Sequence, residues 1–227
     1  MAAPPVLTEE QRKVLTDLAV EHGGAVSSRS NPDGSESPYE LNVTFFDGVN
    51  NPNDPALDDE TQMRRFLVSQ AIPMALVGIP AVYIHCLLGS RNDTDGWQRS
   101  DIKRRINREK LELAQLEADL DDPGSLRARV FGGLIELLET RQSCTAFHPN
   151  ASNEVLDLGR HVFAVLRENA ETGDKILALH NLSGEDIGCA VGDVLPLADA
   201  RDLLDPDARF EPPHVVLPAY GIRWLAV

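Results

Sequence analysis

The sequence predicts an α/β part followed by an all-β part, and three observations point to this fold class. A continuous apolar run from Gly78 to Gly89 has the length of a strand that is buried on both faces, as parallel sheets require. Helical periodicity flanks this run on both sides. After Asn150 the pattern changes to short runs rich in Val, Ile and Leu, which is typical of antiparallel strands. We therefore predict two domains, over residues 1–149 and residues 150–227.

The N-terminal region predicts one helix and one long loop. Thr8-Glu9-Glu10-Gln11 has the pattern of a capping box, and Gly23-Gly24 marks the end of the helix. Between them, apolar residues follow helical spacing at Val14, Leu15, Leu18 and Ala19. Ser27–Pro38 is rich in turn residues and predicts a loop, whose sharpest turn is Asn31-Pro32-Asp33-Gly34. A short ordered segment, Tyr39–Asp47, is expected after it.

Further helices are expected before and after the apolar run. Asp58-Asp59-Glu60 supplies a cap and an acidic first turn. The helix that follows shows the i, i+3, i+4 pattern at Met63, Phe66, Leu67, Gln70, Ala71 and Met74. Beyond the run, Leu113, Leu116 and Leu120 mark a short helix, and Pro123-Gly124-Ser125 begins another that carries Leu126 to Leu138.

The predicted β domain consists of antiparallel strands. Glu168 to Asp174 reads as the loop of a hairpin between two of them. The expected strands are Glu154–Leu158, His161–Arg167, Lys175–Leu182, Ile187–Val191, Val215–Leu217 and Ile222–Val227.

The composition excludes several classes of function. A formal net charge of -15 argues against a nucleic-acid partner, which would need a basic face for the phosphates. No run reaches the ~18 apolar residues of a membrane span, and Met1 to Pro5 lacks the features of a secretory signal. The 3 cysteines, Cys86, Cys144 and Cys189, form no metal or disulfide pattern. We expect a cytoplasmic protein with free thiols, no metal and no cofactor.

Several polar residues near the apolar run are candidates for a site. His85 reads as a ligand, a general base or a hydrogen-bonded structural residue, and the last reading is favoured because no second ligand stands at metal spacing. Asp93 and Asp95 read as paired carboxylates or, more often, as turn residues. The basic cluster Lys103 to Arg108 either binds carboxylates, phosphates and hydroxyls or is a basic helix start that pairs with the surrounding acidic residues. These residues alone do not assemble a nucleophile, an acid and a base.

Six ordered motifs between Ser30 and Asn150 carry a resemblance to a known family. The chain resembles the sucrose phosphorylase-like branch of the α-amylase superfamily, glycoside hydrolase family 13. Within that branch, the residues of its motifs are most similar to those of the glucosylglycerate and sucrose 6-phosphate phosphorylases. The motifs are Ser30–Asn42, Arg65–Ile72, Gly78–His85, Gly89–Asp93, Ile106–Lys110 and Ala146–Asn150.

The resemblance implies the C-terminal part of a (β/α)8 barrel, with the loop after strand seven, helix seven, strand eight and helix eight, followed by a small antiparallel β domain. It also implies a retaining α-glucoside phosphorylase that converts a glucoside and phosphate into α-glucose 1-phosphate and a free acceptor. In the family an Asp nucleophile, a Glu acid/base and a His-Asp pair lie upstream of the matched region. This chain contains no His-Asp dipeptide, so the resemblance implies no catalytic residue here and no activity for the chain alone.

The resemblance also assigns substrate-binding residues. Arg104 matches the arginine that binds glucose hydroxyls, Pro38, Tyr39 and Glu40 match a mobile loop that serves acceptor and phosphate, and Asn42 ends that loop. One departure is Ser100-Asp101-Ile102, where relatives usually read Thr-Gly-Arg. The partner implied is an upstream chain that completes the barrel. The alternative is a non-catalytic carbohydrate-binding or interaction module.

Overall fold

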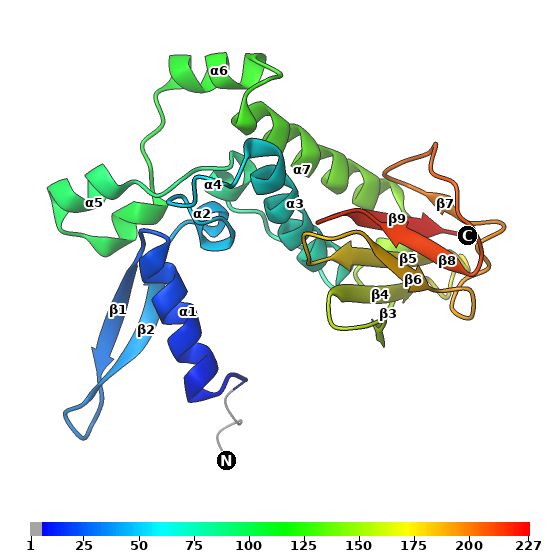
Figure 1. Ribbon diagram of the computed structural model, residues 1–227, viewed down its shortest axis with the longest axis horizontal. Coiled ribbons are helices and arrows are strands. Elements are labelled where there is room, and N and C mark those ends of the chain that lie inside the picture. The colour runs from blue at the N-terminus through cyan, green and yellow to red at the C-terminus, as the bar shows by residue number, and fades with distance from the viewer. Residues whose placement is uncertain (1–5) are drawn as a thin grey trace. The chain divides into compact units, whose positions relative to one another are not determined.

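The computed structural model describes residues 6–227, which form two compact units (Figure 1). Unit 1 comprises the described residues up to Asp58 together with Tyr83–Ala128, and unit 2 comprises Asp59–Val82 with Arg129–Val227. Each unit therefore joins two separate stretches of the chain. The described residues of unit 1 all belong to the predicted domain 1–149, whereas unit 2 takes residues from both predicted domains. The domain boundary near residue 150 stays a prediction.

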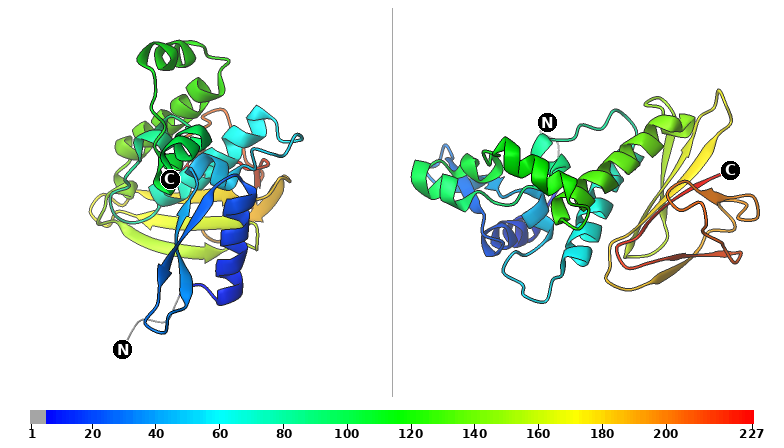
Figure 2. Two further views of the ribbon diagram at one scale, coloured as in Figure 1. Left: turned by 90° about the vertical axis from the view of Figure 1, so that its left-hand side faces the viewer. Right: turned by 90° about the horizontal axis from the view of Figure 1, so that it is seen from above.

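Unit 1 begins with helix α1, Glu9–Glu21, which has the predicted capping box. The Gln11 amide donates to Thr8 Oγ1 at 3.1 Å, and the Thr8 amide donates to Gln11 Oε1 at 2.8 Å. The helix lies beside the hairpin of β1, Ala25–Ser30, and β2, Glu36–Asn42 (Figures 1 and 2). Of its apolar positions only Ala19 is buried, whereas Val14, Leu15 and Leu18 are 51%, 43% and 40% exposed. The apolar stripe of α1 is thus present but largely uncovered.

The predicted loop over Ser27–Pro38 is wrong, because most of it belongs to the β1–β2 hairpin. Its turn was predicted at the correct place: the Gly34 amide donates to the Asn31 carbonyl at 3.0 Å, and Gly34 has a φ of +83° that suits glycine. The two strands are polar and mostly exposed, so they lack the period-two apolar pattern that signals a strand. Backbone pairing across the hairpin decides their structure instead.

The predicted buried strand at Gly78–Gly89 is also wrong. Residues 79–83 belong to no helix or strand, and helix α4 follows at Ile84–Leu87. Ile79 is 85% exposed and Tyr83 is 50% exposed. A central strand requires neighbours on both edges to bond its amides and carbonyls. Every strand pair in the described part of the chain is antiparallel, and none includes this segment.

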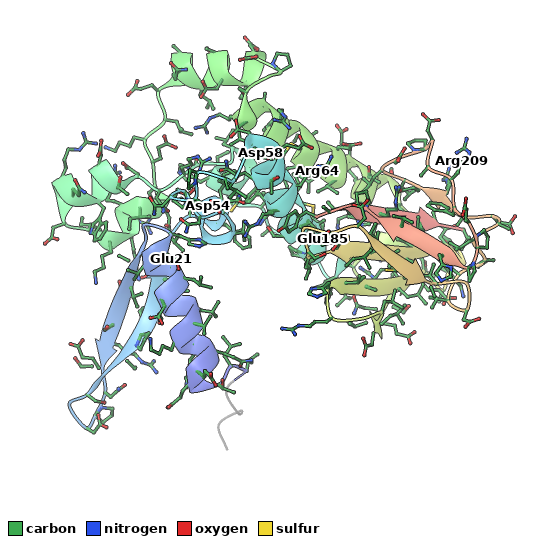
Figure 3. All side chains as sticks on the ribbon, in the orientation of Figure 1. Glu21, Asp54, Asp58, Arg64, Glu185 and Arg209 are labelled. Atoms are coloured by element: carbon green, nitrogen blue, oxygen red, sulfur yellow. The ribbon has the colours of Figure 1, made fainter. Side chains whose placement is uncertain are left out.

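The remaining elements of unit 1 are short helices. They are α2, Phe45–Val49; α5, Thr94–Ser100; the 3₁₀ helix η1, Lys103–Asn107; and α6, Leu113–Asp121. The helix predicted around Leu113 to Leu120 is therefore confirmed. Figure 3 labels Glu21 at the end of α1, where its carboxylate accepts a hydrogen bond from the Asn51 side chain at 3.1 Å and ties the loop after α2 to α1.

Unit 2 contains two long helices and the predicted antiparallel strands. The helices are α3, Asp59–Ala75, and α7, Leu126–Ser143, which begins just before the unit boundary; the 3₁₀ helix η2, Thr145–Phe147, follows. One sheet has the order β3-β4-β5-β9-β7 and a second pairs β6 with β8. Their bounds are β3 Ser152–Asp157, β4 Val162–Glu168, β5 Lys175–Asn181, β6 Ile187–Ala190, β7 Arg201–Asp202, β8 His214–Leu217 and β9 Ile222–Ala226. Among these strands of unit 2, the sequence analysis missed only β7, which is 2 residues long.

Most of the apolar core lies in unit 2. Both faces of β5 are covered: Leu177 and Leu179 belong to a cluster with β6 and β8, and α3 contacts β5. The loop after β5 is closed by Asn181, whose side chain donates to the Glu185 carbonyl at 2.7 Å (Glu185 is labelled in Figure 3). Unit 1 buries far fewer apolar side chains, namely, among its described residues, Ala19, Ala25, Phe46, Leu88 and Ile106.

Two further findings bear on the expectations from composition. Within residues 6–227, no helix is long and apolar enough to cross a bilayer. In the same range, no group of His, Cys, Asp and Glu residues is placed to hold a metal ion.

Candidate functional site

A polar groove of about 420 Å³ in unit 1 brings together three of the five predicted site residues. Tyr39 and Glu40 enter it from β2, and Arg104 enters it from η1. Its complete lining is Ser27, Ser28, Tyr39, Glu40, Asp101, Ile102, Lys103 and Arg104. Pro38 stands beside Tyr39 on β2, and Asn42 lies two residues beyond Glu40 on the same strand.

Tyr39 reaches the groove from an irregularity in the hairpin. Ser27 pairs with Glu40 and Ser28 pairs with Pro38, so Tyr39 is an extra residue without a partner on β1. Such a β-bulge redirects a side chain and is common next to active sites. Pro38 has no amide proton to contribute to the ladder, which fits its position at the irregularity. The Tyr39 side chain is consequently presented to solvent, with 62% of the residue exposed.

Arg104 and Glu40 form an ion pair at the centre of the groove. The Arg104 Nε donates to both carboxylate oxygens of Glu40, at 3.1 and 2.9 Å. The hydrogen bond and the charge of Glu40 raise the pKa of Arg104 above its ordinary value. No hydrogen bond from the two terminal nitrogens of Arg104 to another described residue is found. Those nitrogens are the donors with which a guanidinium binds hydroxyl or anionic oxygens.

The neighbours of Arg104 fix the position of η1. Lys103 Nζ donates to the Val26 carbonyl on β1 at 2.7 Å, and Arg105 pairs with Asp93 at 2.9 Å. Ile106 is fully buried, and its carbonyl accepts the Asp93 amide at 3.0 Å. Lys103 also lines the groove, but its ammonium is held by the Val26 carbonyl, so Arg104 is the member of this basic cluster that offers its terminal nitrogens there.

Asn42 lies behind the groove rather than in it. The residue is fully buried, and its side-chain amide donates to Ser27 Oγ at 2.9 Å. Its carbonyl oxygen Oδ1 is buried without a hydrogen-bond partner among the described residues. Asn42 thus supports the hairpin from within, and a direct contact with a ligand in this groove is not part of the geometry.

A buried polar network that the sequence did not identify joins four segments of unit 1. Asp47 is 1% exposed and accepts hydrogen bonds from Arg91 at 3.0 Å and from the Asn92 amide at 2.7 Å. The Asn92 side chain accepts the Thr44 amide at 2.8 Å and donates to the His22 carbonyl at 3.0 Å. Burial raises the pKa of Asp47, against the opposing effects of the Asn92 amide and Arg91. The signal was the motif Gly89–Asp93, but its partners lie too far away in sequence to be inferred.

The other candidates from the sequence have local roles. His85 Nδ1 is 3.0 Å from Ser90 Oγ, in agreement with a hydrogen-bonded structural histidine, and desolvation lowers its pKa. Asp93 caps α5 by accepting the Gly96 amide at 2.7 Å, whereas Asp95 is an exposed residue of the first turn. The reading of these two as turn residues is therefore the correct one, and the structure does not pair them as an acid and a base.

Comparison with known proteins identifies relatives of the chain. It is 36% identical over 189 residues to a glucosylglycerate phosphorylase from Spirochaeta thermophila, a match that covers 83% of this chain and 32% of the relative. It is 43% identical over 151 residues to the enzyme of that name from Allomeiothermus silvanus, covering 66% of this chain and 27% of the relative. A sucrose phosphorylase from Agrobacterium vitis is 30% identical over 52% of this chain and 20% of its own length. No protein-family model matches the chain.

Solved structures show a similar partial fold. A sucrose 6F-phosphate phosphorylase from Thermoanaerobacter thermosaccharolyticum aligns with a TM-score of 0.61 and 22% identity, over 78% of this chain and 32% of that one. An α-amylase from Geobacillus thermoleovorans aligns with a TM-score of 0.54 and 15% identity, over 80% of this chain and 35% of that one. The chain therefore shares the fold of part of these larger proteins.

The matches cover most of this chain but only about a third of each glucosylglycerate phosphorylase. The sequence resemblance noted above is thus confirmed, since the relatives found carry the names of the family branch that the motifs indicate. The chain is homologous to part of the glucosylglycerate and sucrose phosphorylases.

Proposed function

We propose that the chain supplies the arginine-bearing wall of the glucoside site in a retaining α-glucoside phosphorylase of the glucosylglycerate or sucrose type. The reaction is transfer of a glucosyl group to phosphate, which yields α-glucose 1-phosphate and the free acceptor. The observation that carries the proposal is the identity of 34–43% to three proteins named glucosylglycerate phosphorylase. The unpaired cysteines suit a reducing compartment, and we propose the cytoplasm as its location.

The groove supports a role in binding the sugar. Glu40 holds the Nε edge of Arg104, so the guanidinium plane is oriented before a ligand arrives. The two terminal nitrogens of Arg104 then donate to hydroxyl oxygens of the glucosyl group. Tyr39, displaced by the bulge, contributes an exposed ring and a hydroxyl beside this arginine. Pro38 and Asn42 act through the strand that carries Tyr39 and Glu40.

We propose that the chain has no phosphorylase activity by itself. Double displacement needs a carboxylate nucleophile and a carboxylic acid on the two sides of the glycosidic bond. The resemblance assigns neither role to a residue of this chain. The groove has two carboxylates, Glu40, which is in an ion pair with Arg104, and Asp101, which ends α5. The test is incubation of the purified chain with glucosylglycerate and phosphate, with release of glucose 1-phosphate as the readout. Turnover comparable to that of the Allomeiothermus silvanus relative would refute this proposal.

The role of Arg104 is tested in a chimera in which this chain replaces the matched third of that relative. Arg104→Gln removes two charge-assisted hydrogen bonds of about 1.5–3 kcal/mol each, so kcat/KM should fall by a factor on the order of 100 or more. Arg99→Gln is the matched control, because Arg99 is an exposed arginine in the last turn of α5. An equal effect of both changes, or none of Arg104→Gln, would contradict the assignment.

A second candidate function is a carbohydrate-binding module without catalysis. It is favoured by the open groove, in which the terminal nitrogens of Arg104 and the ring of Tyr39 are accessible without any further chain. Calorimetric titration of the chain with glucose, sucrose and glucosylglycerate separates the two functions. A module binds one of these sugars alone with a Tyr39-dependent affinity, whereas a wall of a larger site binds none of them measurably.

A further inference from the structure

Asp101 is the carboxylate of the groove to which the proposed function gives no role. It ends α5 with a φ of +54° and lines the groove beside Lys103 and Arg104. Its amide donates to the Trp97 carbonyl at 2.8 Å. No hydrogen bond or ion pair of its carboxylate with another described residue is found. Because a carboxylate accepts hydrogen bonds at both oxygens, Asp101 leaves this capacity open to a ligand.

The charges of the groove cancel. It has two carboxylates, Glu40 and Asp101, and two cations. The guanidinium of Arg104 is paired with Glu40 at 2.9 Å, and the ammonium of Lys103 donates to the Val26 carbonyl at 2.7 Å. A ligand group with a negative charge would therefore meet two carboxylates without an excess of positive charge to offset their repulsion.

The rest of the lining suits a neutral ligand with several hydroxyl groups. A hydroxyl both donates and accepts hydrogen bonds, and the groove supplies donors on the terminal nitrogens of Arg104 and acceptors on Asp101. The Ser28 hydroxyl, for which no hydrogen bond to another described residue is found, is able to do both. The groove also exposes the ring of Tyr39 and the side chain of Ile102, whose apolar surface packs against the C–H groups of a polyol.

We infer that Asp101 is a specificity-determining residue, which accepts hydrogen bonds from the hydroxyls of a neutral polyol acceptor and disfavours an acceptor that carries a carboxylate. The inference rests on the proposed function and deepens it, because it concerns the acceptor part of the glucoside in the same groove. Ser100-Asp101-Ile102 is also the segment in which the chain departs from the residues of its relatives. The property therefore belongs to this chain rather than to its family.

The test uses the chimera described above and two glucosides that differ in the charge of the acceptor, glucosylglycerol and glucosylglycerate. The readout is kcat/KM for glucosylglycerate divided by kcat/KM for glucosylglycerol, with phosphate as the second substrate. This ratio should be at least about threefold lower in the chimera than in the Allomeiothermus silvanus phosphorylase, because the two proteins differ only in the third that this chain supplies. A ratio equal to that of the phosphorylase, or above it, would overturn the inference.

A charge-neutralising variant locates the effect at one residue. Asp101→Asn removes the charge and keeps the backbone, since Asn tolerates a positive φ as Asp does. It should raise the ratio about three- to tenfold, and the difference from the unchanged chimera should shrink at high salt because screening weakens the repulsion. Asp95→Asn is the matched control, because Asp95 is an exposed residue in the first turn of α5 and does not line the groove. An equal change with both variants, or none with Asp101→Asn, would contradict the role.

Ile102→Arg tests the same reasoning by adding a cation. Ile102 lines the groove and is 57% exposed, so an arginine is accommodated there and should raise the ratio at least about threefold. Val216→Arg is the control, because Val216 is 58% exposed on β8 in unit 2. A segment with a purely structural role would not gain selectivity for an anion. A ratio that stays constant or falls with Ile102→Arg counts against the charge argument.

Equilibrium binding separates failure of this inference from failure of the proposed function. If the chimera turns over neither glucoside, calorimetric titration gives the dissociation constants of both. Binding without turnover refutes the proposed reaction, and the effect of Asp101→Asn on the ratio of the two constants then decides the inference by the same threefold criterion. A chimera that binds neither glucoside refutes both.

Discussion

Asn92 is predicted to be the most sensitive single residue of unit 1. Among residues 6–227, its side chain is the only hydrogen-bond partner found for two buried backbone groups, the Thr44 amide at 2.8 Å and the His22 carbonyl at 3.0 Å. Thr44 and His22 are 6% and 8% exposed, so water reaches these groups poorly once the amide is removed. An unpaired buried polar group costs about 1–3 kcal/mol. Asn92→Ala should therefore lower the free energy of opening of this region by about 2–4 kcal/mol.

Hydrogen exchange followed by mass spectrometry measures this effect directly. A loss of about 2–4 kcal/mol corresponds to exchange roughly 30- to 700-fold faster in the peptides that contain Thr44 and Asn92. Asn53→Ala is the control: its side chain also donates to a backbone carbonyl, that of Glu21 at 3.0 Å, but at an exposed site. That change should stay within about 0.5 kcal/mol. Acceleration of less than about threefold for Asn92→Ala would refute the reasoning, since the two backbone groups would then have found other partners.

Three more predictions concern stability. Arg167 is fully buried and donates to three carbonyls at 2.7, 2.8 and 2.9 Å. Urea titration should therefore show that Arg167→Met lowers the free energy of unfolding by about 2–4 kcal/mol, whereas the exposed control Arg160→Met should not. A more stable Arg167→Met variant would contradict this, because the cost of burying the charge would then exceed the stabilisation by its hydrogen bonds. Asp101 has a φ of +54°. Asp101→Gly should raise the free energy of unfolding by about 0.5 kcal/mol, because relief of about 1–2 kcal/mol of backbone strain exceeds the entropy that glycine adds to the unfolded chain. The control Asp95→Gly, inside α5, should destabilise by about 1 kcal/mol, and the reverse order would contradict the argument. Burial lowers the pKa of His180 from 6.5 to about 4. Below pH 6.5 the unfolded state therefore binds one more proton than the folded state, and the free energy of unfolding should fall by up to about 3 kcal/mol from pH 6.5 to pH 4. His180→Gln should lose this part of the pH dependence of stability, and parallel plots of unfolding free energy against pH for both proteins would refute the argument.

The residues of the candidate site come from the sequence, but the contacts between them do not, because its members lie far apart along the chain. Arg104, Tyr39 and Glu40 follow from the resemblance, and the structure places them in one groove. Arg104 and Glu40 are 64 positions apart, so no local pattern could show that they pair. Asn42 was predicted with them but supports the strand from behind the groove. The Asp47–Asn92 contact spans 45 positions and was missed for the same reason.

The sequence alone determined the elements whose signals are local. A capping box acts over three residues, so the start of α1 was readable from Thr8 and Gln11. Apolar runs separated by turn residues determined the strands of unit 2, because strands such as β4, β5 and β8 bury at least one face in a core that the chain itself provides. The resemblance to the phosphorylases was likewise contained in short motifs.

The tertiary structure decided the segments whose structure depends on a partner. The polar strands β1 and β2 exist because they pair with each other, although neither has the alternation of a strand. The run from Gly78 has the composition of a buried strand but has no strand to pair with among the described residues, so it stays outside any sheet and leads into α4. Composition sets what a segment is able to bury, whereas hydrogen-bonded neighbours decide whether it becomes a strand.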